Sequence, residues 1–231
     1  SIYSVPTDED KELQDVEEGA AIPETEVKTK EHLVRLTKRG RMLVASYEAL
    51  RFQKLDLFGV MLRQIGAHIQ KQQLADAVNV LINGDGNDNA AVQYSIGSSP
   101  ISGTKGTLGY DQMVEFWGQF DPYTMNTILC STGTMTGMLK IPELQNPMTG
   151  LNFQGTGKLT TPLGAQLHRT GAVADGVIIG LDNRYALELV RAGDVLVEYD
   201  KLIDRQLERA AITSISGFGK ICDGAAAVLN V

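Results

Sequence analysis

The sequence has few of the residues from which metal sites and redox centres are built. Its 231 residues include two cysteines, Cys130 and Cys222, and three histidines, and neither type shows metal-ligand spacing. Distant cysteines outside any Cys-x-x-Cys pair are typical of reduced thiols that pack as small apolar side chains. The composition therefore predicts neither a disulfide nor a bound metal.

Long apolar runs and an excess of basic residues are also missing. No run approaches the roughly 20 apolar residues that span a bilayer, so we expect no membrane partner. The net charge is −7. Proteins that grip nucleic acid through its phosphates usually present a basic surface, so direct DNA binding is not the expected task. A wall that merely encloses DNA needs no such surface.

The motifs of several enzyme classes are absent. A glycine-rich stretch at Asn83–Gly86 follows a helical pattern instead of a strand and lacks the third glycine of a dinucleotide fingerprint. No Gly-x-Ser-x-Gly elbow is present. Asp85, Asn87 and Asn89 imitate the first ligands of a calcium loop, but the glycine and the bidentate glutamate that complete one are missing. We interpret this stretch as a helix end and turn, and we expect no enzyme activity and no cofactor.

What the sequence does contain is a sharp reversal of charge near its start. Residues 1–26 hold nine acids and one base, for a net −8, and residues 27–54 hold eight bases and two acids, for a net +6. Large apolar residues are scarce there, so we expect an extended hairpin over Glu17–Arg41 that contacts a neighbouring subunit more than its own core. The expected contact residues are Glu17, Glu18, Glu24, Glu26, Lys28, Lys30, Arg35, Lys38, Arg39 and Arg41.

The strongest local pattern predicts a long helix over residues 54–82. The segment has no proline, and Phe58, Leu62, Ile65 and Ile69 recur at helical spacing. Such a helix is roughly 43 Å long, so it must run across the molecule or bend near Gly66. We expect its apolar stripe to face one core.

Beyond residue 87 the elements are short and glycine-rich. We expect helices over 110–120 and 131–139, the second capped by Ser131 or Thr132, and a short helix over 201–207. Strands are expected over 126–130, 177–179, 185–190, 195–199, 209–221 and 225–231, with a loop over 146–160. Short helices and strands without a regular βαβ rhythm predict an α+β fold.

Three stretches together resemble the major capsid proteins of tailed bacteriophages, which share the Hong Kong 97 fold. The first pairs an acidic run, Val16–Pro23, with the basic run Val34–Arg51, which enters the long helix. The second is the end of that helix at Leu81–Gly86. The third is the order of strands in the last third of the chain, from 162–167 through 177–182 and 195–221 to 225–231. One departure is that little precedes Glu17, where the family carries an N-terminal arm that laces subunits.

The resemblance implies a Hong Kong 97-like α+β fold with a long spine helix, an extended β-hairpin loop, and mixed axial and peripheral domains. It divides the chain into residues 1–41 (short N-terminal segment and extended loop), 42–96 (peripheral domain with the spine helix), 97–190 (axial domain), 191–221 (peripheral hairpin) and 222–231 (return strand to the axial domain).

The function implied is that of a structural subunit that self-assembles through hexamers and pentamers into an icosahedral shell. The expected partners are further copies of the chain, a portal, and scaffolding or decoration proteins, with packaged DNA enclosed but not specifically bound. The expected location is the virion, after synthesis in the bacterial cytoplasm. Two alternatives stay open: an encapsulin-like nanocompartment shell, and an enzyme whose site carries no known motif.

Overall fold

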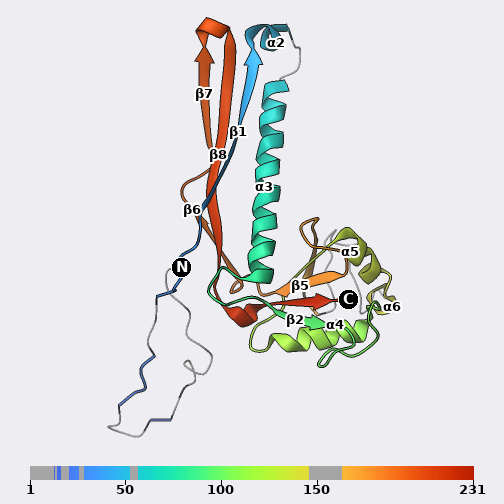
Figure 1. The fold of residues 1–231 in the computed structure, drawn as a ribbon. Helices are drawn as coiled ribbons and strands as arrows, with labels where there is room; N and C mark the ends of the chain where they lie inside the picture. Colours follow the sequence, from blue (N-terminus) through green and yellow to red (C-terminus); the bar gives the residue numbers. More distant parts are fainter. Residues whose placement is uncertain (1–12, 14, 17–20, 26–28, 53–56, 146–162) are drawn as a thin grey trace.

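The computed structural model describes residues 13, 15–16, 21–25, 29–52, 57–145 and 163–231, which form two parts of different shape (Figure 1). An elongated part, here called the arm, consists of one long helix beside a narrow sheet. A compact domain lies at the base of the arm. No helix among the described residues is long and apolar enough to cross a membrane.

The sheet of the arm is organised around its longest strand, β8 (Leu207–Lys220). On one side β8 pairs with β1 (Thr37–Ser46), and on the other with both β6 (Leu187–Arg191) and β7 (Leu196–Leu202). All three pairings are antiparallel. The strands therefore form a ribbon three strands wide, in which β1 and β7 are the two outer edges of the upper arm (Figure 1). The short helices α2 (Tyr47–Phe52) and η2 (Ile203–Arg205) lie at its tip.

The long helix α3 spans Leu57–Asn83, so the expected helix is confirmed as one continuous element of 27 residues. At 1.5 Å per residue it is about 40 Å long. Its end is confirmed too, since Gly84 and Gly86 adopt positive φ angles of 80° and 95°, which glycine accepts without strain. The apolar stripe is not buried evenly: Leu62 and Ile65 are half-buried, whereas Ile69 is buried. The side chain of Phe58 lies outside the described residues.

The compact domain is built on a five-stranded mixed sheet in the order β2-β9-β5-β3-β4. Its strands are β2 (Val92–Ser95), β3 (Thr127–Cys130), β4 (Gln166–Arg169), β5 (Val177–Leu181) and β9 (Ala226–Asn230). Helix α4 (Tyr110–Trp117), continued by η1 (Gly118–Phe120), and helices α5 (Thr132–Leu139) and α6 (Pro142–Gln145) pack around it. A last turn, η3 (Asp223–Ala225), leads from the arm into β9.

The core of this domain explains its compactness. Phe116, Ile128 and Ile178 are fully buried in one apolar cluster between the sheet and the helices. A second cluster on the other side of the sheet takes in Val78 and Leu81, so only the last turns of α3 enter a core. A side chain on Gly180 would overlap Phe116, which shows why this position of β5 is glycine.

The strand pairing departs from the expected domain boundaries at three places. Residues 37–41, expected in an extended loop, begin strand β1 and pair with β8. Strand β2 lies in the compact sheet, although residues 42–96 were expected to be peripheral. Strand β6 pairs with β8 in the arm, although residues 97–190 were expected to be axial. In each case cross-strand pairing decides the location, and pairing is not visible in one sequence.

The expected hairpin over Glu17–Arg41 does not take the predicted form where the chain is described. Residues 17–20 and 26–28 lie outside the described residues, as does the expected loop over 146–160. The described residues 30–36 contain no strand, and residues 37–41 pair with β8 instead of with a partner inside the segment. The α+β class is confirmed, and so is Ser131 as the cap of α5, because its side chain accepts a hydrogen bond from the Thr134 N–H.

Candidate assembly surface

The structure divides the predicted contact residues into three groups. Four lie outside the described residues: Glu17, Glu18, Glu26 and Lys28. Lys30 and Arg39 bind acids of their own chain. The remaining residues are exposed and form no ion pair within the described part of the chain: Glu24, Arg35, Lys38 and Arg41. The three bases of this last group, Arg35, Lys38 and Arg41, are called the basic strip below.

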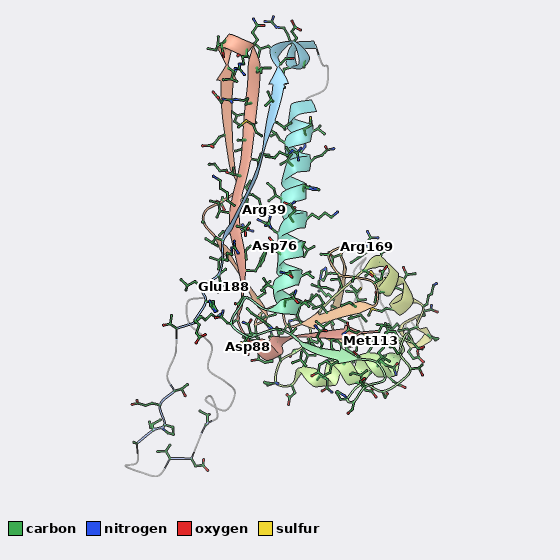
Figure 2. The ribbon with its side chains drawn as sticks, viewed as in Figure 1. Arg39, Asp76, Asp88, Met113, Arg169 and Glu188 are labelled. Carbon is green, nitrogen blue, oxygen red and sulfur yellow. The ribbon has the colours of Figure 1, made fainter. Side chains whose placement is uncertain are left out.

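Arg39 is not available to a neighbour because it already joins the sheet of the arm to α3. Its guanidinium donates to both carboxylate oxygens of Asp76, and the Nη2–Oδ1 distance is 2.9 Å (Figure 2). One turn earlier, Gln73 Nε2 donates to the hydroxyls of Ser214 and Ser216 at 3.2 and 3.1 Å. The helix is therefore held against β1 and β8 by polar contacts as well as by its apolar stripe.

Lys30 belongs to a buried polar cluster where the arm meets the compact domain. Its ammonium donates to the Lys220 carbonyl at 2.5 Å and lies 3.5 Å from Asp85 Oδ2. The Lys220 N–H donates to the same Asp85 oxygen at 2.9 Å, and Lys220 Nζ donates to the Asn89 carbonyl at 2.6 Å. We call these four residues the joint cluster.

The electrostatics of the joint cluster follow from its burial. Lys220 is 1% exposed, and burial lowers its pKa despite the nearby carboxylates of Asp223 and Asp85. Burial alone would raise the pKa of Asp85, but hydrogen bonds from Asn87, Asn89 and the Lys220 N–H, together with Lys30, bring it below its usual value. The resemblance of this stretch to a calcium loop therefore has a structural explanation. Asp85 and its neighbours accept hydrogen bonds from amides and ammonium groups of the chain itself.

The segment before β1 is seated beside this cluster. Val34 lies over Gly217 and Gly219 of β8, where an added side chain would come within 3.1 and 2.6 Å of its methyl groups. His32 exchanges two hydrogen bonds with Asn87: its N–H donates to Asn87 Oδ1 at 2.9 Å, and its carbonyl accepts from Nδ2 at 3.1 Å. Residues 30–35 are therefore fixed to the base of their own arm.

The upper arm leaves large apolar side chains in solvent on both edges. Met42 and Val44 of β1 are 54% and 52% exposed, and Leu196 and Tyr199 of β7 are 53% and 70% exposed. Strands β1 and β7 each pair only with β8 among the described strands. Edge strands with exposed apolar residues are ready to pair with another chain, and soluble proteins that act alone usually protect them.

The compact domain, by contrast, satisfies its buried polar groups internally. The Asp182 carboxylate, fully buried, accepts hydrogen bonds from Arg184, from the Thr124 N–H and from Asn126 Nδ2. The hydrogen bonds from Arg184 lower the pKa of Asp182 to about 2, although burial opposes the shift. Burial raises the pKa of the Cys130 thiol to about 11, so this cysteine is a packed, protonated group.

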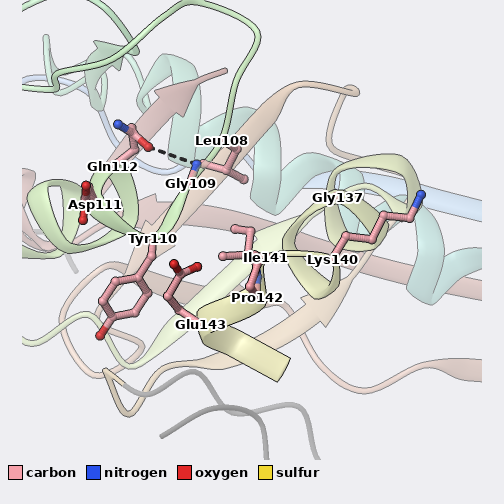
Figure 3. A pocket seen from close by; sticks show the side chains of 10 residues that line it. All are labelled: Leu108, Gly109, Tyr110, Asp111, Gln112, Gly137, Lys140, Ile141, Pro142 and Glu143. Atoms are coloured by element: carbon pink, nitrogen blue, oxygen red, sulfur yellow. Dashed lines mark hydrogen bonds between the residues drawn. The ribbon is translucent and has the colours of Figure 1, made fainter. Parts of the chain in front are cut away.

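One hollow of about 420 Å³ opens between the start of α4 and the α5–α6 turn (Figure 3). Asp111, Lys140 and Glu143 line it, and no hydrogen bond or ion pair joins any two of the three. Within the described ranges, no group of three or more His, Cys, Asp and Glu side chains could hold a metal ion. The geometry of the hollow supports no particular reaction.

Comparisons with known proteins identify the family of this chain. A family model described as "Phage capsid protein" matches residues 29–206, which is more than half of the chain. This chain belongs to the phage capsid protein family. It is therefore a structural protein of a virion and a shell-forming subunit. No curated protein matches the sequence.

Solved structures show that the capsid protein shares its fold with distant relatives. The capsid of a native GTA particle is 12% identical over 94% of this chain and 79% of that chain, with a TM-score of 0.66. The Microbacterium phage Oxtober96 structure is 12% identical over 94% of this chain and 81% of that chain, with a TM-score of 0.64. The holo-SrpI encapsulin complex from Synechococcus elongatus PCC 7942 is 13% identical over 90% and 76%, with a TM-score of 0.58.

Sequence reasoning missed the joint cluster and the free edges of this capsid protein. Asp85 was interpreted only as part of a turn, because nothing in the sequence connects it with Lys220, which is 135 positions away. A weak signal was present in Gly217-Phe218-Gly219-Lys220, where glycines alternate in a strand and so mark one face that another segment approaches closely.

Proposed function

We propose that this chain is the major capsid protein of a tailed bacteriophage and that its copies close into an icosahedral shell around the DNA genome. The family match over residues 29–206 carries the proposal. The shape supports it: a stiff arm with uncovered edges and a self-sufficient compact domain suit a tile that overlaps its neighbours. The DNA is enclosed without specific binding, as the net charge of −7 suggests.

A nanocompartment shell is the second candidate, because the SrpI encapsulin shares the fold. Negative-stain microscopy of the purified protein, with nucleic acid assayed in the particles, separates the two. The proposal predicts closed, uniform particles, with nuclease-resistant DNA in particles isolated from a bacterium that carries the whole gene set. Particles that hold a protein cargo and no DNA would support the nanocompartment, and a protein that stays monomeric under all conditions would contradict both.

Assembly with a portal and with scaffolding or decoration proteins remains an expectation from the family, as does synthesis in the bacterial cytoplasm. For the shell itself, the basic strip is the part of the predicted contact that is exposed and lacks an ion pair within the described residues. Its bases lie on and just before β1, next to the exposed Met42 and Val44. We assign it to a contact between copies, in which partly desolvated charges select the neighbour and its register.

A further inference from the structure

Along the upper arm the β1 edge presents bases and the β7 edge presents acids, whereas β6, below β7, ends in an exposed base, Arg191. The difference between the two upper edges suggests how neighbouring arms meet. On the β1 edge, Lys38 and Arg41 are exposed and form no ion pair within the described residues. On the other edge, Asp194, just before β7, and Glu198, within β7, are likewise exposed and form no described ion pair. The other acid of β7, Asp200, is in use because it pairs with Arg209, and Asp204 of η2 lies 3.7 Å from Arg205.

The charges also lie at matching heights along the arm, because β8 gives both edges a common scale. Lys38 is opposite Ile215 and Arg41 is opposite Ile212. On the other side, Glu198 is opposite Ala211. Asp194 lies in the connection 192–195, whose first N–H donates to the Ile215 carbonyl at 3.0 Å. Lys38 therefore lies at the height where the connection that holds Asp194 begins, and Arg41 lies one residue, or about 3.3 Å, from the height of Glu198.

Strand direction decides which pairing between copies fits these charges. Strands β1 and β7 both run antiparallel to β8, so they run parallel to each other. A two-fold contact between two β1 edges would place bases against bases, and one between two β7 edges would place acids against acids. Only β1 of one copy beside β7 of the next brings opposite charges together, with both arms pointing the same way.

We propose that the β1 edge of one subunit docks against the β7 edge of a neighbouring copy, with the bases Lys38 and Arg41 lying beside the acids Asp194 and Glu198. The inference rests on the proposed shell function and names the surface that the basic strip meets. The exposed apolar residues of both edges supply the buried area, and the charges set the register. Because the contact is head-to-tail, it joins each copy to two others and so propagates around a ring.

A charge-exchange experiment tests the pairing. The first variant carries Lys38→Glu and Arg41→Glu, the second carries Asp194→Lys and Glu198→Lys, and the third carries all four changes. Each double variant makes the two edges alike in charge, and we expect its particle yield to fall at least about tenfold at low salt. The quadruple variant exchanges the signs and restores the net charge, so we expect it to recover parent-like yield.

Circular dichroism confirms the fold of each variant, and light scattering with microscopy measures particles. Lys105→Glu with Lys140→Glu, two exposed lysines of the compact domain, is the control for a change of four charges. A double variant that assembles like the parent overturns the pairing, and so does a quadruple variant that stays defective or a control that fails equally. If the parent chain itself forms no particles, the shell function fails first, and that result is distinct from a failure of the edge variants alone.

Discussion

The arm and the compact domain are stabilised in different ways. The compact domain buries whole aromatic and aliphatic side chains between a sheet and its helices, with Phe116 and Ile178 fully excluded from solvent. The arm has one sheet and one helix, and its contact is partly polar, through Arg39 with Asp76 and Gln73 with Ser214. We expect a part that leaves both edges uncovered to gain stability from its neighbours, and a domain that buries its core within its own chain to depend on them less.

The largest expected effect comes from placing a carboxylate in the core of the compact domain, and the same change in the arm gives a direct comparison of the two parts. Ile178→Asp places a carboxylate in a fully buried position of β5 and should cost several kcal/mol, enough to unfold the compact domain. Leu62→Asp makes the same chemical change on α3, where the side chain is only half-buried. We expect the Leu62→Asp subunit to fold but to assemble poorly. Urea unfolding followed by circular dichroism gives both free energies; equal losses would contradict the comparison.

The joint cluster links the two parts, and disrupting it should have the second-largest effect on stability. Asp85→Asn removes the carboxylate that lies 3.5 Å from the buried Lys30 ammonium and that accepts from the Lys220 N–H, and it should cost about 3 kcal/mol. Thermal unfolding of the free subunit measures the loss. Asp88→Asn, an exposed position in the same turn, is the matched control. If both variants melt like the parent, the cluster does not hold the arm to the compact domain.

Acid should weaken the compact domain through Asp182. Its pKa is about 2 in the folded chain and 3.8 is the ordinary value, so the unfolded chain binds the proton more readily. This stabilisation, about 2 kcal/mol, is complete above pH 4 and is lost as the pH falls toward 2. Asp182→Asn should be less stable at pH 7 and should lose less stability between pH 4 and pH 2. Unfolding curves at these pH values measure how the free energy of unfolding changes with pH. The same change in the variant and the parent would show that Asp182 does not cause the acid sensitivity.

The smallest effect is expected for the ion pair inside the arm. Arg39 and Asp76 have side chains 27% and 38% exposed, so Arg39→Gln should cost at most about 1 kcal/mol of subunit stability. Its particle yield should stay near that of the parent, because Arg39 faces its own helix. A severe assembly defect in a well-folded Arg39→Gln subunit would show that this base also serves a neighbour.

Local patterns in the sequence were enough to predict most of the elements. The helical spacing and the Asn-Gly turn located α3 and its end, and the apolar runs located β3, β5, β8 and β9. Prediction from the sequence fails where contacts between residues far apart in the chain determine the structure. Residues 37–41 carry the charge expected of a projecting loop, yet their backbone completes a sheet with β8. Strand β2 has only four residues and no clear alternation, and it was missed.

The contact predicted from the charge pattern stays a prediction, and the structure shows which of its residues are free for it. Of its predicted bases, three are exposed on the arm and form no ion pair within the described residues. Lys30 and Arg39 looked the same in the sequence but are bound by Asp85 and Asp76, whose positions depend on the path of α3. The acids of the proposed partner edge could not be found from the sequence, because the height of β7 along the arm is defined only by its register with β8.

The central claim, that the compact domain is complete by itself and the arm is completed by its neighbours, is tested most directly by hydrogen exchange. Amide exchange would be measured by mass spectrometry on the free subunit and on assembled particles. We predict that amides of β5 and β9 exchange slowly in both states, whereas those of β1 and β7 exchange quickly in the free subunit and become protected in particles. Equal protection of β1 and β7 in both states would contradict the claim.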